Sequence, residues 1–316
     1  MTRLATDDVS ALAKQASGRE GEGRRALITG LRGFTGHYLA QELTAAGYRV
    51  LGTVMPGEET GPDMFAVDLC DRDAVAAMVA EARPDVVAHL AGIAFVGHAN
   101  VEAIYRVNVA GTRNLLEALS AGKHRPTSVL LASSANIYGN ASVAVIDENV
   151  PAAPANDYAV SKLAMEYMAR LWMDRLPIVI VRPFNYTGVG QSENFLLPKI
   201  VSHFRRQEKH IELGNLEIAR DFSDVRLVAR SYRRLLAAAP SGEAFNICSG
   251  RSDSLARVID MMGEIAGYRI DVRVNPAFVR ANDVLQLTGD NSKLSAVVGE
   301  LAPPPLYDTL RWMYQA

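Results

Sequence analysis

The sequence is poor in cysteine, in long apolar runs and in charge of one sign. Its 316 residues include two cysteines, Cys70 and Cys248, and neither has a His or Cys neighbour at metal-ligand spacing. This pattern argues against a disulfide framework and against a zinc or other metal site, and it favours a reducing cytoplasm. No apolar run approaches the about 20 residues that a membrane span needs, so no membrane contact is expected.

The charges are balanced, with 33 Lys and Arg against 35 Asp and Glu and a net charge of −2 at pH 7. The two signs are interspersed along the chain. The sequence therefore offers neither a basic face for nucleic acid nor a polybasic segment for anionic lipid. Residues 1–24 are polar and lack the continuous apolar stretch of a secretory signal, so we expect them to form a mobile extension.

From Arg25 onward, short apolar runs alternate with helical patterns. The expected strands are "RALIT", "YRVLGTV", "DVVAHLAG", "SVLLAS" and "PIVIVRPFN", and the expected helices begin near Phe34 and Asp71 or extend over 101–119 and 157–175. Strands that are apolar throughout, separated by helices of about ten residues or more, indicate a parallel sheet covered on both faces. The predicted fold class is α/β, with a Rossmann-type doubly wound parallel sheet.

Three glycines follow the first expected strand. In "ITGLRGFTG", Gly30, Gly33 and Gly36 lie between that strand and the first helix. Glycines there permit a tight turn and close approach of the backbone to a pyrophosphate, while the helix N-terminus supplies free N–H groups and positive potential. A turn that only packs the helix on the strand has the same composition, but the position in the first βαβ unit favours dinucleotide binding.

The second expected strand ends without the acidic residue that usually binds the ribose hydroxyls of NAD. It reads "GTVMPG", and the next acid is Glu58. Because a carboxylate would repel a 2′-phosphate, its absence permits NADP, and Arg32 in the glycine loop could pair with that phosphate. Arg32 could also be a solvated loop residue. The sequence thus favours NADP, with NAD as the alternative.

Tyr158 and Lys162 in "YAVSK" are four residues apart, which places both on one face of a helix. An adjacent ammonium lowers the pKa of a phenol by favouring the phenolate, so the tyrosine becomes usable for proton transfer at neutral pH. Such a pair also occurs on ordinary amphipathic helices, where it only covers surface. The Tyr-Lys pair alone therefore does not distinguish a catalytic role from a surface role, and neighbouring motifs must decide.

The strand "SVLLA" is followed by "SSANIYG", in which Ser134 lies just beyond the strand. The ligand crevice of a doubly wound sheet lies outside the carboxyl ends of its strands, so Ser134 is placed to hydrogen-bond a reacting oxygen beside Tyr158. Ser133 and Ser134 could instead cap the following turn. The glycine loop, this serine and the Tyr-Lys pair together favour a dinucleotide-dependent enzyme. His89, at the end of another apolar strand, is interpreted as a core histidine.

These motifs resemble those of the extended short-chain dehydrogenases/reductases that act on nucleotide sugars, the NAD-dependent epimerase/dehydratase family. "TGLRGFTG" is similar to the family's TGxxGxxG, "VDLCD" to its adenine-contacting segment, "HLAG" to its third-strand motif and "NVAGTRNLLEA" to its fourth helix. The resemblance implies a catalytic triad of Ser134, Tyr158 and Lys162. It implies cofactor contacts from Gly30, Arg32, Gly33, Phe34, Gly36, Asp68, Leu69, Leu90, Ala91, Gly92, Asn108, Tyr158 and Lys162.

The resemblance also implies that the chain contains a cofactor-binding domain and a substrate-binding cap. Residues 25–185 would form the dinucleotide-binding Rossmann domain with the catalytic residues, and residues 186–316 mainly a smaller C-terminal substrate-binding cap. Segments near 221–250, including "FNICSG", would return to the Rossmann domain. The implied substrate-binding residues are Ser134, Asn136, Asn185, Lys199, Arg220, Arg280 and Asp283. Two positions depart from the family pattern: Leu227, where a second Asp is usual, and Ala281, where Pro is usual.

Ala135 and Asn136 bear on the reaction. The 4,6-dehydratases that resemble this chain carry Glu, often preceded by Asp, at these two positions, because elimination of water needs a base and an acid. An amide exchanges no proton at neutral pH, so dehydration is not expected. The segments "RPFNYTGVGQ", "ENFLLPKIV" and "ARDFSDV" are most similar to those of GDP-4-keto-6-deoxy-D-mannose reductases.

The resemblance therefore implies NAD(P)H-dependent reduction of the 4-keto group of GDP-6-deoxy-D-lyxo-4-hexulose to a GDP-6-deoxyhexose, either GDP-D-rhamnose or its talose epimer. A nucleotide-sugar 4-epimerase with tightly bound NAD is the alternative, and a cofactor-sensing protein without turnover is a third interpretation. The resemblance also implies a homodimer formed through the helices near 101–119 and 157–175, with a tetramer left open. The nucleotide base, the configuration at carbon 4 and the pathway stay open at this stage.

Overall fold

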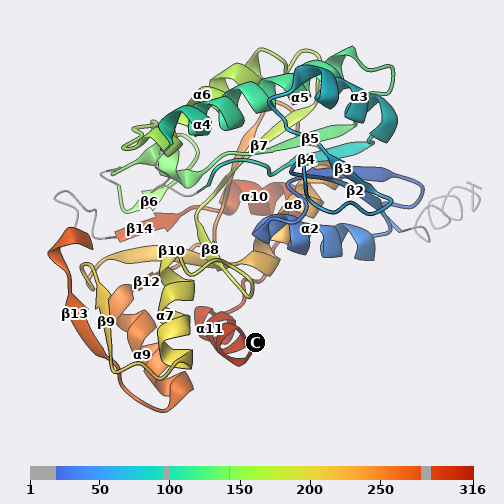
Figure 1. Cartoon of the computed structure of the whole chain (residues 1–316). Coiled ribbons are helices and arrows are strands. Elements are labelled where there is room, and N and C mark those ends of the chain that lie inside the picture. Colours follow the sequence, from blue (N-terminus) through green and yellow to red (C-terminus); the bar gives the residue numbers. More distant parts are fainter. Residues whose placement is uncertain (1–18, 95–99, 142, 279–285) are drawn as a thin grey trace, which may run out of the picture.

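The main sheet contains seven parallel strands in the order β11-β7-β5-β4-β1-β2-β3 (Figure 1). The computed structural model describes residues 19–94, 100–141, 143–278 and 286–316. The strands are β1 Arg25–Thr29, β2 Arg49–Val54, β3 Met64–Ala66, β4 Val86–His89, β5 Ser128–Ala132, β7 Ile178–Pro183 and β11 Ala244–Ile247. The strand order reverses at β1, as in a doubly wound sheet. The predicted α/β fold is therefore confirmed.

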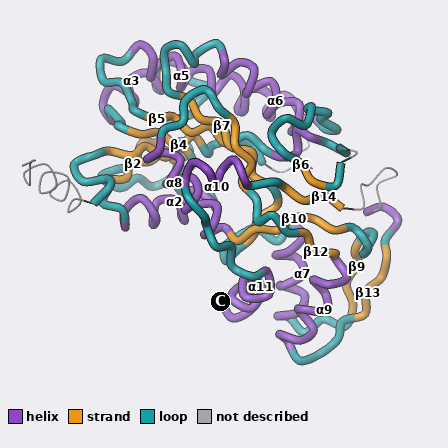
Figure 2. Tube along the Cα trace, turned by 180° about the vertical axis from the view of Figure 1, so that it is seen from behind, coloured by secondary structure: helices purple, strands orange, loops and turns teal. Residues whose placement is uncertain are grey.

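Helices cover both faces of this sheet (Figures 1 and 2). One face packs against α3 Arg72–Ala82, α5 Thr112–Ala121 and α6 Asp157–Arg170, and the other against α2 Phe34–Ala45, α8 Val225–Ala238 and α10 Ser292–Val298. Successive residues of β1 pack on opposite faces of the sheet. Leu27 packs on the face covered by α3, α5 and α6, and Ile28 packs on the face covered by α2, α8 and α10. This explains why the strands are apolar throughout. None of the helices in the described ranges is long and apolar enough to cross a membrane.

Two helices differ from their predicted course. The segment predicted as one helix over 101–119 consists of α4 Val101–Tyr105, a π-helical segment Arg106–Gly111, and α5. The helix predicted to reach about residue 175 ends at Arg170, because the N–H of Leu171 bonds back to the Met168 carbonyl oxygen at 3.1 Å and the chain tightens into turns. Trp172 is then buried against the core of the sheet domain.

The C-terminal part has its own sheets and its own apolar core (Figure 2). One sheet has the order β12-β10-β14-β6, with β8 also paired to β10, and β9 and β13 form a separate parallel pair. The strands of these sheets are β6 Val145–Ile146, which comes from the N-terminal part of the chain and pairs with β14, and β8 Asn185–Thr187, β9 His210–Leu213, β10 Ala219–Asp224, β12 Ser252–Ser254, β13 Asp271–Val274 and β14 Gln286–Gly289. The core of the C-terminal part lies among the helices α7 Leu196–Arg205, α9 Leu255–Ala266 and α11 Leu306–Gln315. Short 3-10 turns occur at Ala135–Tyr138 and Pro276–Phe278.

Asp221 of β10 joins the two parts. Its buried carboxylate accepts hydrogen bonds from the Ser249 N–H at 2.9 Å, the Ser249 hydroxyl at 2.7 Å and the Gly250 N–H at 2.9 Å. Both partners directly follow β11 of the main sheet. Burial raises the pKa of Asp221, and these donors oppose that shift.

Candidate active site

The glycine loop after β1 leaves the backbone uncovered at the start of α2. Gly30 adopts a φ of +73°, which glycine tolerates best, and its N–H bonds to the Thr53 hydroxyl at 3.1 Å. A Cβ on Gly36 would collide with the Gly30 carbonyl oxygen and lie 2.6 Å from that of Leu31. Gly33, the N-cap residue of α2, provides no side-chain cap. The first N–H groups of α2 therefore stay available for an anion.

Asn108 links the end of β4 to α6. Its amide oxygen accepts the Ile93 N–H at 2.9 Å, and its amide nitrogen donates to the Ser161 hydroxyl at 3.0 Å. A Cβ on Gly92 would lie 2.9 Å from the amide oxygen of Asn108 and 3.4 Å from Lys162 Nζ. Gly92 thus passes directly beside Lys162 of α6, whereas Ala91 lies beside Gly30 of the glycine loop and Leu90 packs against the core on the opposite face of the sheet. The π-helical segment that carries Asn108 is a feature often found at functional sites.

The predicted triad is brought together by β5 and α6. Ser134 lies two residues beyond β5, and Tyr158 and Lys162 lie in the first half of α6, which Asn156 caps through a 2.9 Å bond from the Ala159 N–H. All three side chains are buried. Lys162 Nζ donates to the Ala132 carbonyl oxygen at 2.8 Å and lies 6.0 Å from the centre of the Tyr158 ring. The Ser134 hydroxyl lies close enough to the Tyr158 phenol to lower the pKa of that phenol.

The protonation of this pair differs from the sequence-based expectation. Burial raises the pKa of Tyr158 to about 12, and the Ser134 hydroxyl opposes this rise. Burial lowers the pKa of Lys162 to about 8, and the Glu166 carboxylate opposes that shift. The expectation of a Tyr158 pKa near neutral pH is therefore not met in this structure, because burial of the phenol raises that pKa.

Arg32 and Asp68 are the two residues predicted to contact the adenosine half of a dinucleotide. Arg32 donates a 2.6 Å bond to the Glu59 carbonyl oxygen and lies 3.4 Å from the Glu58 carboxylate, so it contacts the loop that follows β2. Asp68 accepts the Cys70 N–H at 2.9 Å, and Leu69 is buried. The guanidinium is exposed, as is its partner Glu58, so this ion pair is weak.

His89 is held by two hydroxyls inside the sheet domain. Its ring nitrogens lie 2.7 Å from the Thr29 hydroxyl and 2.8 Å from the Thr112 hydroxyl. Burial and the nearby Lys162 lower its pKa to about 3, so the ring is neutral at physiological pH. The interpretation of His89 as a core histidine is confirmed.

The predicted substrate-binding residues are spread over several elements. Asn136 is exposed, and its amide nitrogen donates to the Ser134 hydroxyl oxygen at 3.0 Å. Asn185 on β8 and Arg220 on β10 lie on paired strands. Lys199 on α7 donates to the Glu212 carbonyl oxygen at 3.1 Å, within the C-terminal part. Arg280 and Asp283 lie outside the described residues.

One departure from the family pattern has a structural explanation. Leu227 is buried in α8, within the apolar core on one face of the main sheet. A carboxylate there would be desolvated without a partner, so an apolar residue suits the position. Ala281 lies outside the described residues.

Sequence reasoning missed several polar side chains beside the triad. The Tyr186 phenol bonds to the Thr35 hydroxyl at 2.8 Å, and its ring stacks on Phe34 with centroids 6.0 Å apart. Glu166 follows Lys162 by one helical turn and pairs with Arg182 of β7. An arginine inside the apolar run "VIVRP" was the signal that could have found this pair, because a charge inside a buried strand needs a partner.

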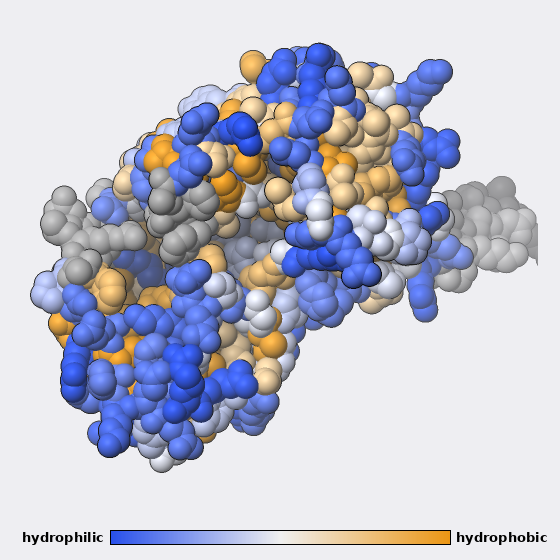
Figure 3. Space-filling model, in the orientation of Figure 1, coloured by the Kyte–Doolittle hydropathy of each residue, from blue (hydrophilic) through white to orange (hydrophobic). Residues whose placement is uncertain are grey.

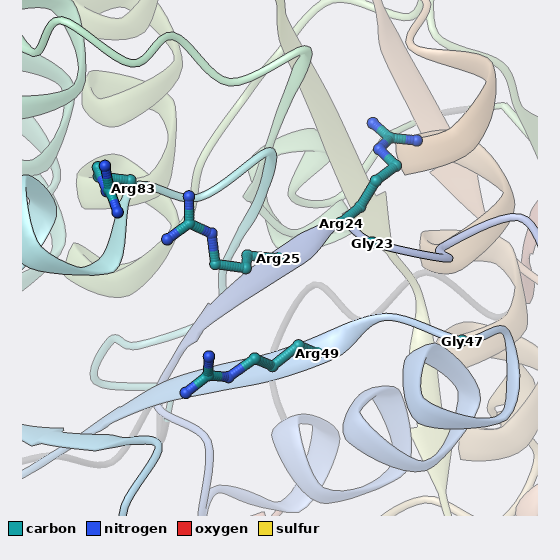
Figure 4. Close-up of a pocket in the computed structure, with 6 residues that line it drawn as sticks. All are labelled: Gly23, Arg24, Arg25, Gly47, Arg49 and Arg83. Carbon is teal, nitrogen blue, oxygen red and sulfur yellow. The ribbon is translucent and has the colours of Figure 1, made fainter.

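The surface is hollowed between the part that holds the main sheet and the C-terminal part (Figure 3). A separate cavity of about 440 Å³ is lined by Gly23, Arg24, Arg25, Gly47, Arg49 and Arg83 (Figure 4). Gly23, Arg24 and Gly47 precede β1 and β2, and Arg25 and Arg49 begin these strands, so this cavity lies at the edge opposite to the carboxyl ends. It contains none of the predicted site residues.

Comparison with known sequences identifies the family. The profile of the NAD dependent epimerase/dehydratase family matches residues 26–248. The chain belongs to this family. It is therefore an NAD(P)-dependent enzyme of the extended short-chain dehydrogenase/reductase type, and its cofactor is a nicotinamide dinucleotide. The glycine loop has no room for a Cβ at Gly36, and the start of α2 has no side-chain cap. Both features suit the binding of a dinucleotide pyrophosphate.

Two curated relatives cover most of the chain. GDP-6-deoxy-D-talose 4-dehydrogenase from Aggregatibacter actinomycetemcomitans is 36% identical over 276 residues, which are 86% of this chain and 90% of the relative. GDP-6-deoxy-D-mannose reductase from Pseudomonas aeruginosa is 32% identical over 287 residues, 87% of this chain and 91% of the relative.

Solved structures show the same fold. A candidate epimerase from Burkholderia cenocepacia J2315 superposes with a TM-score of 0.89 at 56% identity and covers 94% of this chain and 98% of its own. RMD from Pseudomonas aeruginosa complexed with NADPH superposes with a TM-score of 0.81 at 29% identity and covers 92% of this chain and 98% of its own.

Proposed function

We propose that this enzyme reduces the 4-keto group of GDP-6-deoxy-D-lyxo-4-hexulose with NADPH and forms GDP-D-rhamnose or its talose epimer. Family membership and the two relatives support a nucleotide-sugar role of the reductase or epimerase type. Both relatives carry a GDP-6-deoxyhexose in their names, which favours a GDP-linked sugar over other nucleotide sugars. The choice of reduction rests on the residues beside Tyr158.

The observation that carries this proposal is the contact between Asn136 and Ser134. The amide nitrogen and the backbone N–H of Asn136 both donate to the Ser134 hydroxyl oxygen, at 3.0 and 3.1 Å. These bonds orient the hydroxyl and leave its hydrogen free for Tyr158 or a substrate oxygen. A dehydratase needs a proton-exchanging group at the position of Asn136, and an amide supplies none. The site is thus suited to carbonyl polarisation and proton donation.

The mechanism follows from the protonation states. When bound, the reduced cofactor supplies the hydride that reduces carbon 4. Ser134 donates a hydrogen bond to the carbonyl oxygen, and Tyr158 donates its phenolic proton as negative charge develops there. Burial raises the pKa of the phenol to about 12, so it is protonated at neutral pH and can donate this proton. Lys162, with a pKa of about 8, supplies a positive charge next to the phenol.

Cofactor binding is assigned to the sheet domain. The glycine loop and the start of α2 would hold the pyrophosphate, and Asn108 and Lys162 would hold the nicotinamide end. Arg32 would leave its weak pair with Glu58 to bind the 2′-phosphate of NADPH, because a phosphate accepts two guanidinium hydrogen bonds. NADPH is therefore the proposed cofactor and NADH the alternative.

Substrate binding is assigned mainly to residues 186–316. Asn185 and Arg220 lie on paired strands, and an arginine fork suits the diphosphate of a nucleotide sugar. Lys199, Arg280 and Asp283 complete the proposed set with Ser134 and Asn136. Segment 221–250 contributes α8 and β11 to the main sheet domain, so the proposed cap is not continuous in sequence.

We also propose a homodimer. Apolar side chains are exposed on α4, on α6 and just beyond α6, and they are Val101, Val160, Tyr167 and Leu171. Leu171 is 72% exposed and Tyr167 is 59% exposed. Apolar patches of this kind mark interaction sites, and a second copy would cover them through the same helices.

The deciding experiment uses GDP-6-deoxy-D-lyxo-4-hexulose made freshly by a GDP-mannose dehydratase. NADPH absorbance is followed after the purified enzyme is added, NADH is tested in parallel, and the sugar product is identified by NMR. Stoichiometric NADPH oxidation is expected, and the configuration at carbon 4 then names the product. No oxidation, together with interconversion of unmodified nucleotide hexoses without added cofactor, would identify a 4-epimerase instead.

A further inference from the structure

A buried ion pair lies directly behind the proposed catalytic residues. Arg182 of β7 binds the Glu166 carboxylate with both sides of its guanidinium, with Nη2–Oε2 at 2.7 Å and Nε–Oε1 at 3.0 Å. The Glu166 side chain is fully buried, and that of Arg182 is 9% exposed. The free energy needed to desolvate two charges is often larger than the free energy gained from their attraction. An apolar pair of similar volume would therefore stabilise the fold at least as well. Stability alone does not explain this pair.

Glu166 is on the element that carries the catalytic tyrosine and lysine. It follows Lys162 by four residues on α6, and Lys162 follows Tyr158 by four, so the three side chains form one stripe along the helix. Figure 1 shows α6 lying along the same side of the sheet as α4 and α5. A contact that fixes Glu166 therefore fixes the rotation of α6 about its axis, and with it the direction of the Lys162 and Tyr158 side chains.

Arg182 also contacts the segment that carries Ser134. Its Nη1 donates to the Tyr138 phenol oxygen at 2.9 Å, and that phenol donates to the Asn246 amide oxygen at 2.8 Å. Tyr138 is the last residue of the 3-10 turn that begins directly after Ser134. One guanidinium thus connects the helix of Tyr158 and Lys162 with the turn of Ser134.

The rest of this network is satisfied by neighbouring groups. The Asn246 N–H donates to the Glu148 carboxylate at 2.7 Å, and the Asn246 amide nitrogen donates to the Ile146 carbonyl oxygen at 3.0 Å. Arg182 Nη1 also lies within 3.3 Å of the Glu148 carbonyl oxygen. A fully satisfied buried network is rigid, whereas a partly broken one is costly.

We propose that Arg182 and Glu166 are positioning residues that hold Ser134 against Tyr158 and keep Lys162 charged. The inference rests on the proposed catalytic roles of these three residues. Tyr138 extends the same function to the Ser134 turn. None of the positioning residues needs to touch the substrate, because they act through α6 and through the turn.

The charge of Lys162 supports this assignment. The titratable and charged groups that face Lys162 in the described residues are Tyr158 and Glu166 on α6, His89 on β4, and Arg182 behind Glu166. Tyr158 and His89 are neutral at pH 7 because burial sets their pKa at about 12 and about 3. Glu166 is therefore the anion that stabilises the ammonium of Lys162, and its carboxylate also balances Arg182.

The test compares Glu166→Gln with the wild-type enzyme and with Asp224→Asn. Asp224 is the matched control, because its buried carboxylate also binds an arginine, Arg226, at 2.6 Å but lies at the start of α8. NADPH affinity is measured by fluorescence titration from pH 6 to 10, and kcat and KM are measured with the 4-keto sugar. Folding of each variant is checked by circular dichroism and thermal unfolding.

In Glu166→Gln, we expect the loss of NADPH affinity at high pH to begin about one pH unit lower than in the wild type, because an anion near Lys162 is gone. We expect kcat to fall by about 100-fold through misplaced reacting groups, with KM for the sugar changed less than kcat. Asp224→Asn should lose stability without moving the pH dependence. The proposal is overturned if Glu166→Gln keeps the wild-type pH dependence and loses no more kcat than Asp224→Asn.

Two further variants keep the test decisive if Glu166→Gln does not fold. Tyr138→Phe removes only the link to the Ser134 turn and should lower kcat by about tenfold, the effect of one hydrogen bond to a charged group. Arg182→Lys keeps the positive charge and leaves Glu166 in place but loses the bidentate contact, so it should keep the wild-type pH dependence while its kcat falls. Full kcat in Tyr138→Phe would also overturn the proposal.

The proposed function can fail separately. A wild-type enzyme that binds NADPH with the expected pH dependence but does not oxidise it with the 4-keto sugar would refute the reductase assignment. The shift in the pH dependence of cofactor binding would still test the positioning pair.

Discussion

Lys162 Nζ donates a 2.8 Å hydrogen bond to the carbonyl oxygen of Ala132, the last residue of β5. This bond ties the middle of α6 to the strand end that leads into Ser134. The acceptor is a neutral carbonyl, so the ammonium is buried without a directly bonded carboxylate, and burial lowers its pKa to about 8. The buried ammonium therefore lowers the stability of the folded protein at neutral pH.

Lys162→Met should make the protein more stable at pH 7. The pKa of Lys162 is lower in the folded than in the unfolded chain, so the unfolded chain binds more protons and wild-type stability rises between about pH 8 and 10.5. The rise attributable to Lys162 is on the order of 3 kcal/mol. Urea unfolding at several pH values measures it. If the free energy of unfolding changes equally with pH in Lys162→Met and in the wild type, the low pKa of a buried Lys162 would be contradicted.

Tyr158→Phe should lower kcat by about 10³-fold, the usual range for losing a general acid, while NADPH affinity changes little. The Tyr158 phenol is buried and close to Ser134, whereas Tyr167 on the same helix is exposed. Tyr167→Phe is therefore the matched control and should keep full activity. Steady-state kinetics and fluorescence titration measure both effects, and substantial turnover in Tyr158→Phe would refute the proposed acid.

Gly36→Ala should weaken NADPH binding, because the added Cβ would press on the Gly30 and Leu31 carbonyl oxygens. Overpacking of this kind costs about 1–3 kcal/mol, so the affinity for NADPH should fall by about fivefold to 150-fold. Gly61→Ala is the control, since its Cβ would meet only Met64 Sδ at 4.0 Å. Similar dissociation constants for the two variants would argue against cofactor binding at this loop.

Arg32→Ala should reduce the preference for NADPH over NADH by about tenfold or more, because a charge-assisted contact to the 2′-phosphate is lost. Glu58→Gln should act in the opposite direction, since it releases Arg32 from its 3.4 Å ion pair. Arg72→Ala, which removes an exposed arginine paired with Glu117 on another face, is the control. The measured quantity is the ratio of kcat/KM for NADPH to kcat/KM for NADH. An unchanged ratio in Arg32→Ala would show that Arg32 does not bind the 2′-phosphate.

Leu171→Glu should produce monomers if the exposed apolar side chains around α6 form the dimer contact. A buried unpaired carboxylate in such an interface is costly, so dimerisation should be lost rather than weakened slightly. Val297→Glu on α10 changes another exposed apolar residue and should leave the assembly unchanged. Light scattering coupled to size-exclusion chromatography gives the mass. A dimeric Leu171→Glu protein would place the interface elsewhere.

The sequence predicted those features that depend on local pattern. Gly36 was recognisable because a turn between strand and helix needs glycine there, and Ser134 because a buried strand ended in hydroxyls. The π-helical segment around Asn108 was not predictable, since its apolar spacing fits an α-helix nearly as well. The early end of α6 depends on Trp172 packing into the core, which is a tertiary effect.

The protonation states and the positioning network could not be predicted for a different reason. Burial raises the pKa of Tyr158, and an electrostatic contribution from Tyr186, which is distant in sequence, raises it further. Glu166 and Arg182 belong to a helix and a strand whose contact exists only in the fold. The sequence shows that Glu166 and Arg182 are charged residues among apolar ones, but it does not show that they form an ion pair with each other.

Asp221 limits how the two parts of the enzyme can move. Its carboxylate receives three hydrogen bonds from the segment that leaves β11, so the main sheet and β10 share one buried anchor. A hinge needs residues whose backbone can rotate without breaking buried bonds. At this junction such rotation would strip a desolvated carboxylate of its donors. A clamshell opening of the kind seen in many two-lobed enzymes would therefore cost the free energy of these buried bonds.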